Sequence, residues 1–544
     1  MHSFIRRAPD RSRHHDAIVI GSGVGGAMVA HGLVDAGLRV LMIERGPRVK
    51  RAPENWASDA VLELSPYYSM ESCLSVRGDD HGRLGTFQCV GGPAVFYGGV
   101  SYRMREVDFS PCPEIVTDSQ ACWPYGYADI EPYYGWAERI LGVAGRSSCD
   151  PLEPPRSAAY PNLAPDVQGP AKLIWAAASS LGLNPTHLPL AIDFDGRSGA
   201  GSACAMCGTC DGYVCAVSAK RDPAAAIIPA LERRGLTLLP DTVVVRLLRR
   251  GGRVVGVECV NRNTGRHEVL QADRYVLAAG ALGSPHVIQA SGLHTSSPAG
   301  DWVGRCLMRH CNGIVFGLFG RPLEGSRQFH KQVGLMDFYG GCDGAPKLGS
   351  IQSIHPPPSG LVADRLPGLL QGLTEPMADR STGLLVIAED QPNQRNRVDA
   401  SRSETDRYGV PTTVITHRYT WRDTAARRDL ASVARAVLKR AGAKFTQGVR
   451  IKTFSHAVGT LRMGRDPRTS PLDPSSRFRG VENLWVTDGS FMPRSAAVNP
   501  SLTIAANALM AAERIAGVSI RERQGTAPRS SALVGYASGM GADR

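Results

Sequence analysis

The sequence predicts an α/β protein in which a Rossmann-like, nucleotide-binding domain is interleaved with an α+β domain built on an antiparallel sheet. The first observation is a short apolar strand at 16–20 that runs directly into a glycine-rich turn and a helix. The second is a pair of strands, at 274–277 and 484–487, that end in small residues far along the chain. The third is alternation of apolar and polar residues at 383–389 and 412–419, which favours strands of a second sheet.

The glycine-rich turn has the form GxGxxG and includes Gly21, Gly23, Gly25 and Gly26. In this motif the first glycine makes the turn, the second lets a pyrophosphate approach backbone N–H groups at the helix N-terminus, and the last lets helix and strand pack closely. A second strand at 38–43 ends in Glu44, about 20 residues after the glycines, where an acid holds a ribose hydroxyl. A glycine-rich surface turn would not account for Glu44, so the order of these elements predicts a dinucleotide site.

The later strand ends indicate which dinucleotide is bound. A nicotinamide enzyme usually completes its nucleotide fold in one continuous block, whereas here matching pieces recur around Ala279 and Gly280 and again around Asp488 and Gly489. Small residues after a strand also serve simple packing. Three such strand ends spread over the whole chain favour FAD.

The best indication of the chemistry is a separated pair, His456 and Asn499. Histidine titrates near neutral pH and can take a proton from an alcohol, while an amide can hold the same oxygen by hydrogen bonding. A lone histidine is more often structural, so the pair gains meaning only because the chain also supplies a hydride acceptor.

These segments resemble the glucose-methanol-choline (GMC) oxidoreductases over nearly the whole of 16–516, most specifically at 455–464 and 483–508. The resemblance implies an FAD-binding domain of the glutathione-reductase type, with His456 as catalytic base and Asn499 as its partner. It also implies that 488–489 meets the flavin pyrophosphate and ribityl chain, and that 500–502 lies beside the flavin ring. The cofactor-binding residues expected on this basis are Gly21, Gly23, Gly25, Gly26, Glu44, Arg45, Gly91, Gly92, Val244, Ala279, Gly280, Asp488, Gly489, Pro500, Ser501 and Leu502.

The segment 89–99 resembles the family's second glycine motif, which lies over the isoalloxazine. It departs from the pattern because Pro93 follows Gly91 and Gly92 where the family usually has Ser or Thr, and proline has no N–H to donate. Some members attach the flavin covalently through a histidine here. The sequence has no histidine between His81 and His187, so we expect non-covalent FAD.

Composition agrees with an ordinary globular enzyme. The chain has 544 residues, 43% of them hydrophobic and 21% charged, and its length suggests roughly two to four domains. The net charge of +12 comes mainly from scattered arginines rather than from basic clusters with interleaved aromatics, which favours a solvated basic surface over nucleic-acid binding. Neither an apolar leader at 1–15 nor an apolar run of about 18 residues is present, so we expect a cytoplasmic protein with no membrane span.

The expected organisation is discontinuous. Segments 16–110, 220–300 and 450–516 should form the FAD-binding domain, 111–219 and 301–449 the substrate domain, and 1–15 and 521–544 flexible termini. A hairpin is expected from 243–249 and 254–261 around a Gly-Gly turn, and apolar residues at helical spacing predict a helix at 423–441.

Four of the 13 cysteines cluster as Cys204, Cys207, Cys210 and Cys215. Their spacing is compatible with iron–sulfur ligation, and some flavin dehydrogenases of the resembled family carry such a cluster in a comparable segment. Other members keep a similar turn without a metal, no proline follows Cys215, and the spacing is not that of paired zinc knuckles. Free or structural thiols are the favoured interpretation; an Fe–S cluster, zinc and a disulfide are the alternatives.

The predicted reaction is oxidation of an alcohol to an aldehyde or ketone, with His456 taking the hydroxyl proton and hydride passing to the flavin, which oxygen or another acceptor reoxidises. A lyase without net oxidation and an electron-transferring redox subunit are alternatives. The substrate expected is a small-molecule sugar, glycoside or natural product, for example the primary hydroxyl of an aminoglycoside amino sugar, whose cationic charge Glu389 or Asp390 could balance unless they are structural. Sterols or other hydrophobic alcohols are the second choice.

Overall fold

The computed structural model describes residues 14–147, 150, 152–197, 201–340, 347–359, 362, 372 and 374–520. Most of the two termini predicted to be flexible, 1–13 and 521–544, lies outside these residues. The first strand begins at His15, the last residue of the segment predicted to be a flexible lead-in.

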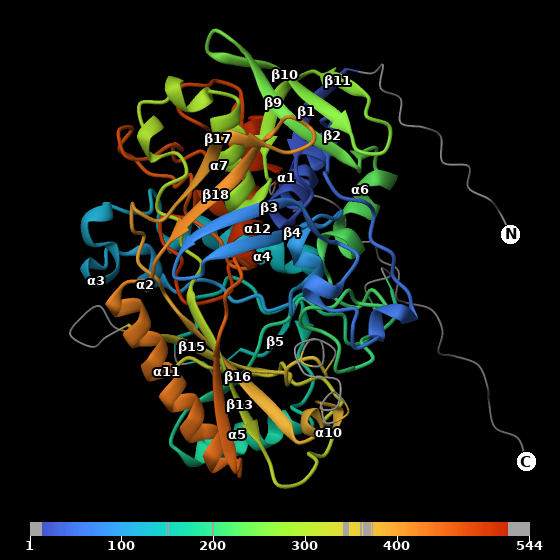
Figure 1. Ribbon diagram of the computed structural model, residues 1–544, viewed down its shortest axis with the longest axis vertical. Coiled ribbons are helices and arrows are strands. Elements are labelled where there is room, and N and C mark those ends of the chain that lie inside the picture. The colour runs from blue at the N-terminus through green and yellow to red at the C-terminus, as the bar shows by residue number, and fades with distance from the viewer. Residues whose placement is uncertain are drawn as a thin grey trace, which may run out of the picture.

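A parallel five-stranded sheet forms the nucleotide-binding part, as the sequence predicts. Its order is β20-β12-β1-β2-β8, with β1 at His15–Ile20, β2 at Val40–Ile43, β8 at Thr237–Leu239, β12 at Ala272–Leu277 and β20 at Leu484–Val486. The central strands are almost wholly buried, as expected when helices cover both faces of a parallel sheet. Helices α1 (Val24–Asp35) and α12 (Ser501–Ala516) pack together where Gly32 faces Ala512. Figure 1 shows β1, β2 and α1 in the upper part of the molecule, with α12 below them.

The small residues after β12 do not form the expected loop. Ala279 caps helix α7 (Gly280–Ala290), and the N–H of Gly280 donates to the carboxylate of Asp488, 3.1 Å away. Because the first N–H groups of a helix have no partner within it, this acid beyond β20 lets the helix start directly at the sheet edge. The predicted hairpin is present as β9 (Thr242–Arg250) and β10 (Arg253–Asn261), and β11 (His267–Leu270) completes an antiparallel three-stranded sheet.

An antiparallel six-stranded sheet forms the substrate-facing part. Its order is β19-β13-β16-β15-β14-β7, with β7 at Pro185–His187, β13 at Cys311–Leu318, β14 at Val333–Leu335, β15 at Gly349–Ile354, β16 at Ser381–Ala388 and β19 at Phe445–Arg450. Helices α5 (Pro170–Ser180) and α11 (Trp421–Arg440) pack on it, and their apolar residues share a buried core with Val315 and Val386. Figure 1 shows this layer in the lower part, with α11 along its edge.

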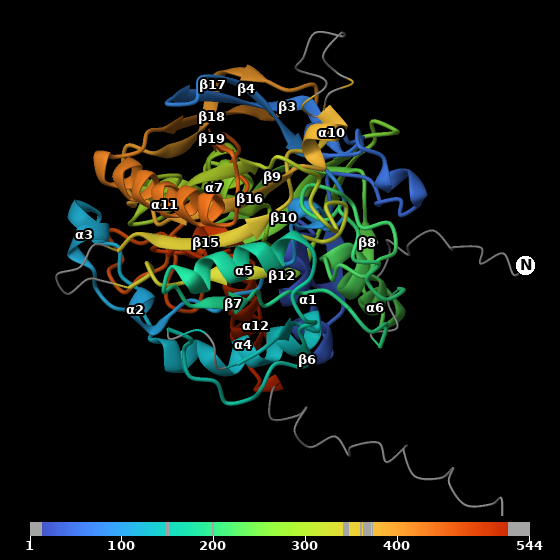
Figure 2. The same ribbon diagram turned by 90° about the horizontal axis from the view of Figure 1, so that it is seen from below.

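A further four-stranded sheet joins segments that are distant in sequence. It consists of β17 (Arg397–Thr405), β18 (Pro411–His417), β3 (Tyr68–Gly78) and β4 (Gly82–Phe87), and β18 runs parallel to β3. Thus the strand expected at 412–419 forms, but it pairs with the segment after β2 rather than with the six-stranded sheet. Figure 2 shows this sheet on the opposite side of the molecule from α4 and α12.

The remaining helices are short except α4. They are α2 (Glu106–Phe109), α3 (Pro113–Val116), α4 (Tyr127–Leu141), α6 (Ile228–Arg233) and α10 (Thr374–Ala378). In the part of the chain that the structure describes, no helix combines the length and the apolar character needed to cross a membrane.

Candidate active site

One large cavity, of about 1680 Å³, lies between the carboxyl ends of the parallel strands and the six-stranded sheet. Ile20, Ile43 and Ala278, at the ends of β1, β2 and β12, line one end of it. Asn312 of β13 and His456 line another part. Typical small-molecule pockets are about 300–1,000 Å³, so this cavity has room for a dinucleotide and a substrate together.

The glycine turn after β1 forms a cradle at the first end. Gly21 has φ +102°, a left-handed conformation that favours glycine. A Cβ at Gly25 would lie 2.2 Å from the backbone oxygen of Thr487, so α1 approaches the end of β20 through this glycine. In contrast, a Cβ at Gly23 or Gly280 would meet no protein atom within 4 Å, although both residues line the cavity. These backbones therefore face open space at the helix N-termini, which fits the pyrophosphate of a dinucleotide.

Glu44 closes the same end from β2. Its carboxylate accepts hydrogen bonds from Ser22, with the backbone N at 3.1 Å and Oγ at 2.5 Å, and from the N–H of Gly46 at 2.9 Å. Burial raises its pKa, while these donors oppose the shift. The acid lines the cavity beside the glycine turn, which is the arrangement expected for a ribose-binding group.

Asp488 organises the opposite edge of the cradle. It accepts from the N–H of Gly280 at 3.1 Å and from the N–H of Ser490 at 2.9 Å, and the hydroxyl of Ser284 also donates to it. Burial raises the pKa of Asp488 and these hydrogen bonds lower it. One carboxylate therefore fixes the starts of α7 and of the turn at Gly489–Phe491, both of which border the cavity.

The cavity extends from this cradle past Val244 of β9 to Arg45. Arg45 pairs with Asp406 at 2.9 Å, and its guanidinium lies 5.9 Å from the centre of the Tyr408 ring. An apolar wall with a fixed planar cation beside it suits an adenine ring, so these residues fit the adenosine half of FAD.

The second glycine motif closes the cavity from another side. Gly91 has φ +95° and donates its N–H to the hydroxyl of Ser22, 2.9 Å away. Gly92 and Pro93 then begin a short turn of 3-10 helix. The first N–H groups of a helix have no partner within it, so the missing N–H of Pro93 costs no helical hydrogen bond. Pro93 itself lines the cavity, so it presents ring carbons rather than a donor to a bound flavin.

Three of the cofactor-binding candidates do not line the cavity. Gly26 packs against the oxygen of Gly21, where a Cβ would lie 2.0 Å away, Gly91 supports Ser22, and Leu502 is buried in the core. The candidates that do line it are Gly21, Gly23, Gly25, Glu44, Arg45, Gly92, Val244, Ala279, Gly280, Asp488, Gly489, Pro500 and Ser501, together with His456 and Asn499.

His456 faces a second histidine that sequence reasoning missed. Met308 and Val458 form an antiparallel bridge with N···O distances of 3.0 and 2.9 Å. His310 follows Met308 by two residues and His456 precedes Val458 by two, so in this antiparallel pair they occupy opposite positions on one face. Their Nδ1 atoms are 2.9 Å apart, and the rings meet edge to face. No local sequence signal could reveal this pair, because it depends on pairing between residues 146 positions apart.

The pKa of His456 lies well below its ordinary value, mainly because burial disfavours the charged imidazolium and also because Lys331 adds positive potential. His456 is therefore neutral at pH 7. Its Nε2 makes no hydrogen bond to any described residue, and the ring lines the cavity. This is the state that a general base needs.

Asn499 is oriented by Gln352 of β15. Nε2 of Gln352, whose side chain is buried, donates to Oδ1 of Asn499 at 2.8 Å. With its oxygen engaged in this way, Asn499 has its NH₂ left to offer, and the residue lines the cavity. The site thus combines a proton acceptor, His456, with a hydrogen-bond donor, the NH₂ of Asn499. Both can interact with an alcohol oxygen.

The four clustered cysteines are all free thiols. They surround a void of only about 20 Å³. Burial raises the pKa of Cys204 to about 11 and that of Cys210 well above its ordinary value. Free or structural thiols stay the favoured prediction, and no finding supports an Fe–S cluster at the described cysteines.

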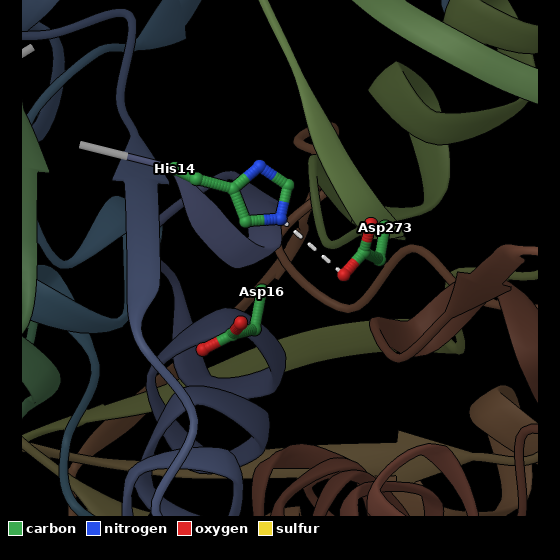
Figure 3. Close-up of side chains that lie close together, drawn as sticks. All are labelled: His14, Asp16 and Asp273. Atoms are coloured by element: carbon green, nitrogen blue, oxygen red, sulfur yellow. Dashed lines mark hydrogen bonds and ion pairs between the residues drawn. The ribbon is translucent and has the colours of Figure 1, made fainter. Parts of the chain in front are cut away.

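Among the described residues, a single group of three potential metal ligands comes together, and it is elsewhere. His14, Asp16 and Asp273 lie near the start of β1 (Figure 3), where His14 contacts Asp273 at 3.4 Å. Arg39 already pairs with Asp16 at 3.0 Å, and the group is largely exposed. An ion pair explains this cluster without a metal.

The fold and the site together define a flavin-dependent alcohol oxidoreductase: a nucleotide cradle, a neutral histidine and an amide open onto one cavity. Residues 162–312 and 392–508 match the GMC oxidoreductase family. Over 528 residues the chain is 32% identical to 6'''-hydroxyparomomycin C oxidase of Streptomyces lividus, with 92% of this chain and 91% of that protein covered. The chain therefore belongs to the GMC oxidoreductase family, which binds FAD.

Two further comparisons agree. Paromamine 6'-oxidase of Streptomyces fradiae is 31% identical over 93% of this chain and 92% of its own length. Among solved structures, pyridoxine 4-oxidase from Mesorbium loti superposes with a TM-score of 0.67 at 20% identity, covering 93% of this chain and all of that one, which shows the shared fold.

Proposed function

We propose that this enzyme oxidises the primary hydroxyl of an amino sugar, of the kind found in aminoglycosides, to an aldehyde. The observation that carries the proposal is the pairing, in one cavity, of the neutral base His456 with the amide of Asn499. The two similar oxidases named above act on aminoglycosides according to their names, which supports this substrate class.

The charge of the cavity supports a cationic substrate even though the whole chain is basic. Outside the cofactor end, the described lining residues include two cations, Arg327 and Lys331, which pair with Asp379 and Asp211 at 3.0 Å each. They also include the carboxylate of Glu375. A carboxylate on this wall attracts ammonium groups more strongly than neutral sugars.

Each polar residue then has a defined task. Nε2 of His456 takes the proton of the substrate hydroxyl, and the NH₂ of Asn499 donates to the oxygen as its negative charge grows. The glycine turn, Glu44 and Asp488 would hold FAD, which would supply the acceptor for the hydride of the carbinol carbon. The alcohol thus loses one proton and one hydride and becomes an aldehyde.

A hydrophobic alcohol is the second candidate, because one wall of the cavity is apolar. On alternate positions of β13 and in the segment from β19 onward, this wall consists of Ile314, Phe316, Leu318, Phe445, Val449 and Ile451. Such a wall can stack on the C–H faces of a sugar ring, but it would also accept a sterol.

The decisive test mixes the FAD-loaded enzyme with an alcohol in the absence of oxygen. Reduction of the flavin is measured as the loss of its visible absorbance. We expect paromamine to bleach the flavin, and its analogue with an amino group in place of the 6'-hydroxyl to leave the flavin oxidised. Bleaching by cholesterol and not by paromamine would support the second candidate. Failure of every alcohol tried to reduce the flavin would contradict the proposal.

The electron acceptor is tested with the reduced enzyme. We propose oxygen, because the two similar proteins are oxidases by name. Hydrogen peroxide formed in proportion to aldehyde would support oxygen, whereas reoxidation by a quinone alone would indicate a dehydrogenase. The cytoplasmic location expected from the sequence stays a proposal and is tested by fractionation of the producing cells.

A further inference from the structure

His310 is a buried histidine that the proposed reaction does not use. It has no exposed surface, and both of its ring nitrogens have partners: Nε2 lies 3.0 Å from the carbonyl oxygen of Ser495, and Nδ1 lies 2.9 Å from Nδ1 of His456. Its backbone is left-handed, with φ +57°. A non-glycine residue in this conformation costs about 1–3 kcal/mol and persists only where its surroundings impose it.

The two contacts fix where the protons lie. A carbonyl oxygen only accepts, so Nε2 of His310 must carry a proton and donate to Ser495. In a neutral His310 that proton is the only one on the ring, so its Nδ1 is an acceptor. The hydrogen bond between the two Nδ1 atoms then requires the proton on Nδ1 of His456. A neutral imidazole carries one proton, so Nε2 of His456 keeps its lone pair.

A buried carboxylate holds the two ends of this chain together. Asp390 accepts from the N–H of Arg309 at 2.8 Å and from the hydroxyl of Ser495 at 2.7 Å. It is fully buried and so are its partners. Asp390 thus connects Arg309, which precedes His310, to Ser495, whose carbonyl oxygen accepts the hydrogen bond from Nε2 of His310. This connection keeps the carbonyl at hydrogen-bonding distance.

We propose that His310 is a positioning residue that selects the tautomer of His456, so that Nε2 presents a lone pair to the substrate hydroxyl. The inference rests on the proposed function for its catalytic consequence but not for its structural content. In the opposite arrangement, His310 would be an imidazolium, Nδ1 of His456 would accept, and Nε2 would carry a proton and be unable to act as base.

Asn312 does not decide between the two arrangements. Its Nδ2 lies 3.5 Å from Nδ1 of His456, which would favour an acceptor at that nitrogen. However, Oδ1 of Asn312 is buried without a partner among the described residues. Turning this amide by 180° exchanges the two atoms and places an acceptor beside Nδ1 of His456.

The tautomer can be read without turnover. In the FAD-loaded enzyme labelled with ¹⁵N-histidine, we expect one imidazole with a protonated Nδ1 and a bare Nε2 that disappears in His456→Gln. A signal assigned to His456 in this way but showing a protonated Nε2 at pH 7 would overturn the proposal, whether or not any alcohol proves to be a substrate.

The catalytic consequence is tested with a nearly isosteric pair. His310→Asn keeps an acceptor near Nδ1 of His456, whereas His310→Leu removes it at similar volume. We expect His310→Leu to slow flavin reduction by about 10²-fold with little change in substrate affinity, because the base is present but wrongly protonated or turned. His310→Asn should recover much of this loss.

The matched control is His330, another fully buried histidine, which bonds to Ser326 and Thr382 and not to His456. His330→Leu should leave the rate of flavin reduction within about threefold of wild type once FAD is bound. Equal losses in the two leucine variants, or a His310→Leu enzyme that is reduced as fast as wild type, would refute a specific positioning role. An unmodified enzyme that no alcohol reduces would instead refute the proposed function and leave the spectroscopic result to decide the tautomer.

Discussion

Gly23 and Gly25, at the start of α1, have different surroundings, so replacing each with alanine should have different effects. A methyl group at Gly25 would lie 2.2 Å from the oxygen of Thr487 and 3.0 Å from Cα of Asp488, and neither backbone atom can move cheaply. A methyl group at Gly23 would meet no protein atom within 4 Å, and the φ of −64° at this residue suits alanine. We therefore expect Gly25→Ala to damage the fold and Gly23→Ala to damage only cofactor binding.

The magnitudes follow from these contacts. Forcing α1 away from the end of β20 should destabilise the FAD-free Gly25→Ala protein by about 1–3 kcal/mol, the usual cost of overpacking. The FAD-free Gly23→Ala protein should stay within about 0.5 kcal/mol of wild type, as for substitutions that touch nothing. Its methyl group would occupy space that the pyrophosphate needs, and losing one hydrogen bond to a charged group, about 1.5–3 kcal/mol, corresponds to roughly 10- to 100-fold weaker FAD binding.

Two measurements separate the effects. Urea denaturation of the FAD-free proteins reports stability, and titration with FAD, followed by quenching of flavin fluorescence, reports affinity. A Gly23→Ala protein that binds FAD as tightly as wild type would show that the pyrophosphate does not approach this backbone. A Gly25→Ala protein as stable as wild type would contradict the close approach of α1 to Thr487.

Three further outcomes are expected. His456→Ala should slow anaerobic flavin reduction by about 10² or more, and because burial lowers the pKa of His456, the wild-type rate should persist below pH 6.5 and fall only in more acid solution. Glu389→Gln should destabilise the protein by about 3–5 kcal/mol in denaturant, because Glu389 is the carboxylate that pairs with both buried Lys347 and buried Arg494. The control Glu404→Gln, at an exposed residue, should have little effect on stability. Burial raises the folded-state pKa of Asp423 to about 7, so the wild type should lose stability as the pH rises from about 4 through 7, and Asp423→Asn should not.

The fold class and the family could be predicted because their signals are local. The strand at 16–20, the glycine turn and Glu44 follow one another in the chain, and each has its own physical signature. The pairing of β3 with β18 could not be predicted, because the residues of neither strand indicate with which distant segment it pairs. The start of α7 at Gly280 was missed for the same reason, because its cap comes from Asp488, 208 residues away.

The environment of the proposed catalytic pair, His456 and Asn499, could not be predicted from the sequence either. His310 meets His456 across 146 residues, and Gln352 meets Asn499 across 147. The suggestion that Glu389 or Asp390 balances a cationic substrate is not supported, because both are fully buried and neither lines the cavity. Residue type alone cannot distinguish a buried structural carboxylate from one that faces a ligand.

Because Asp390 is buried, it can support His310 but cannot contact the substrate. This acid joins Arg309 to Ser495, the two residues that flank the proposed position of His310 behind the proposed base His456. Under the proposed function, recognition of substrate ammonium groups would fall to carboxylates of the cavity lining such as Glu375. Because a lining carboxylate contacts substrate in the ground state as well as the transition state, Glu375→Gln should raise KM with little change in kcat. Asp390→Asn should lower kcat at nearly constant KM, since it disturbs only the base; the reverse pattern in steady-state kinetics with an amino sugar would show that Asp390 recognises substrate after all.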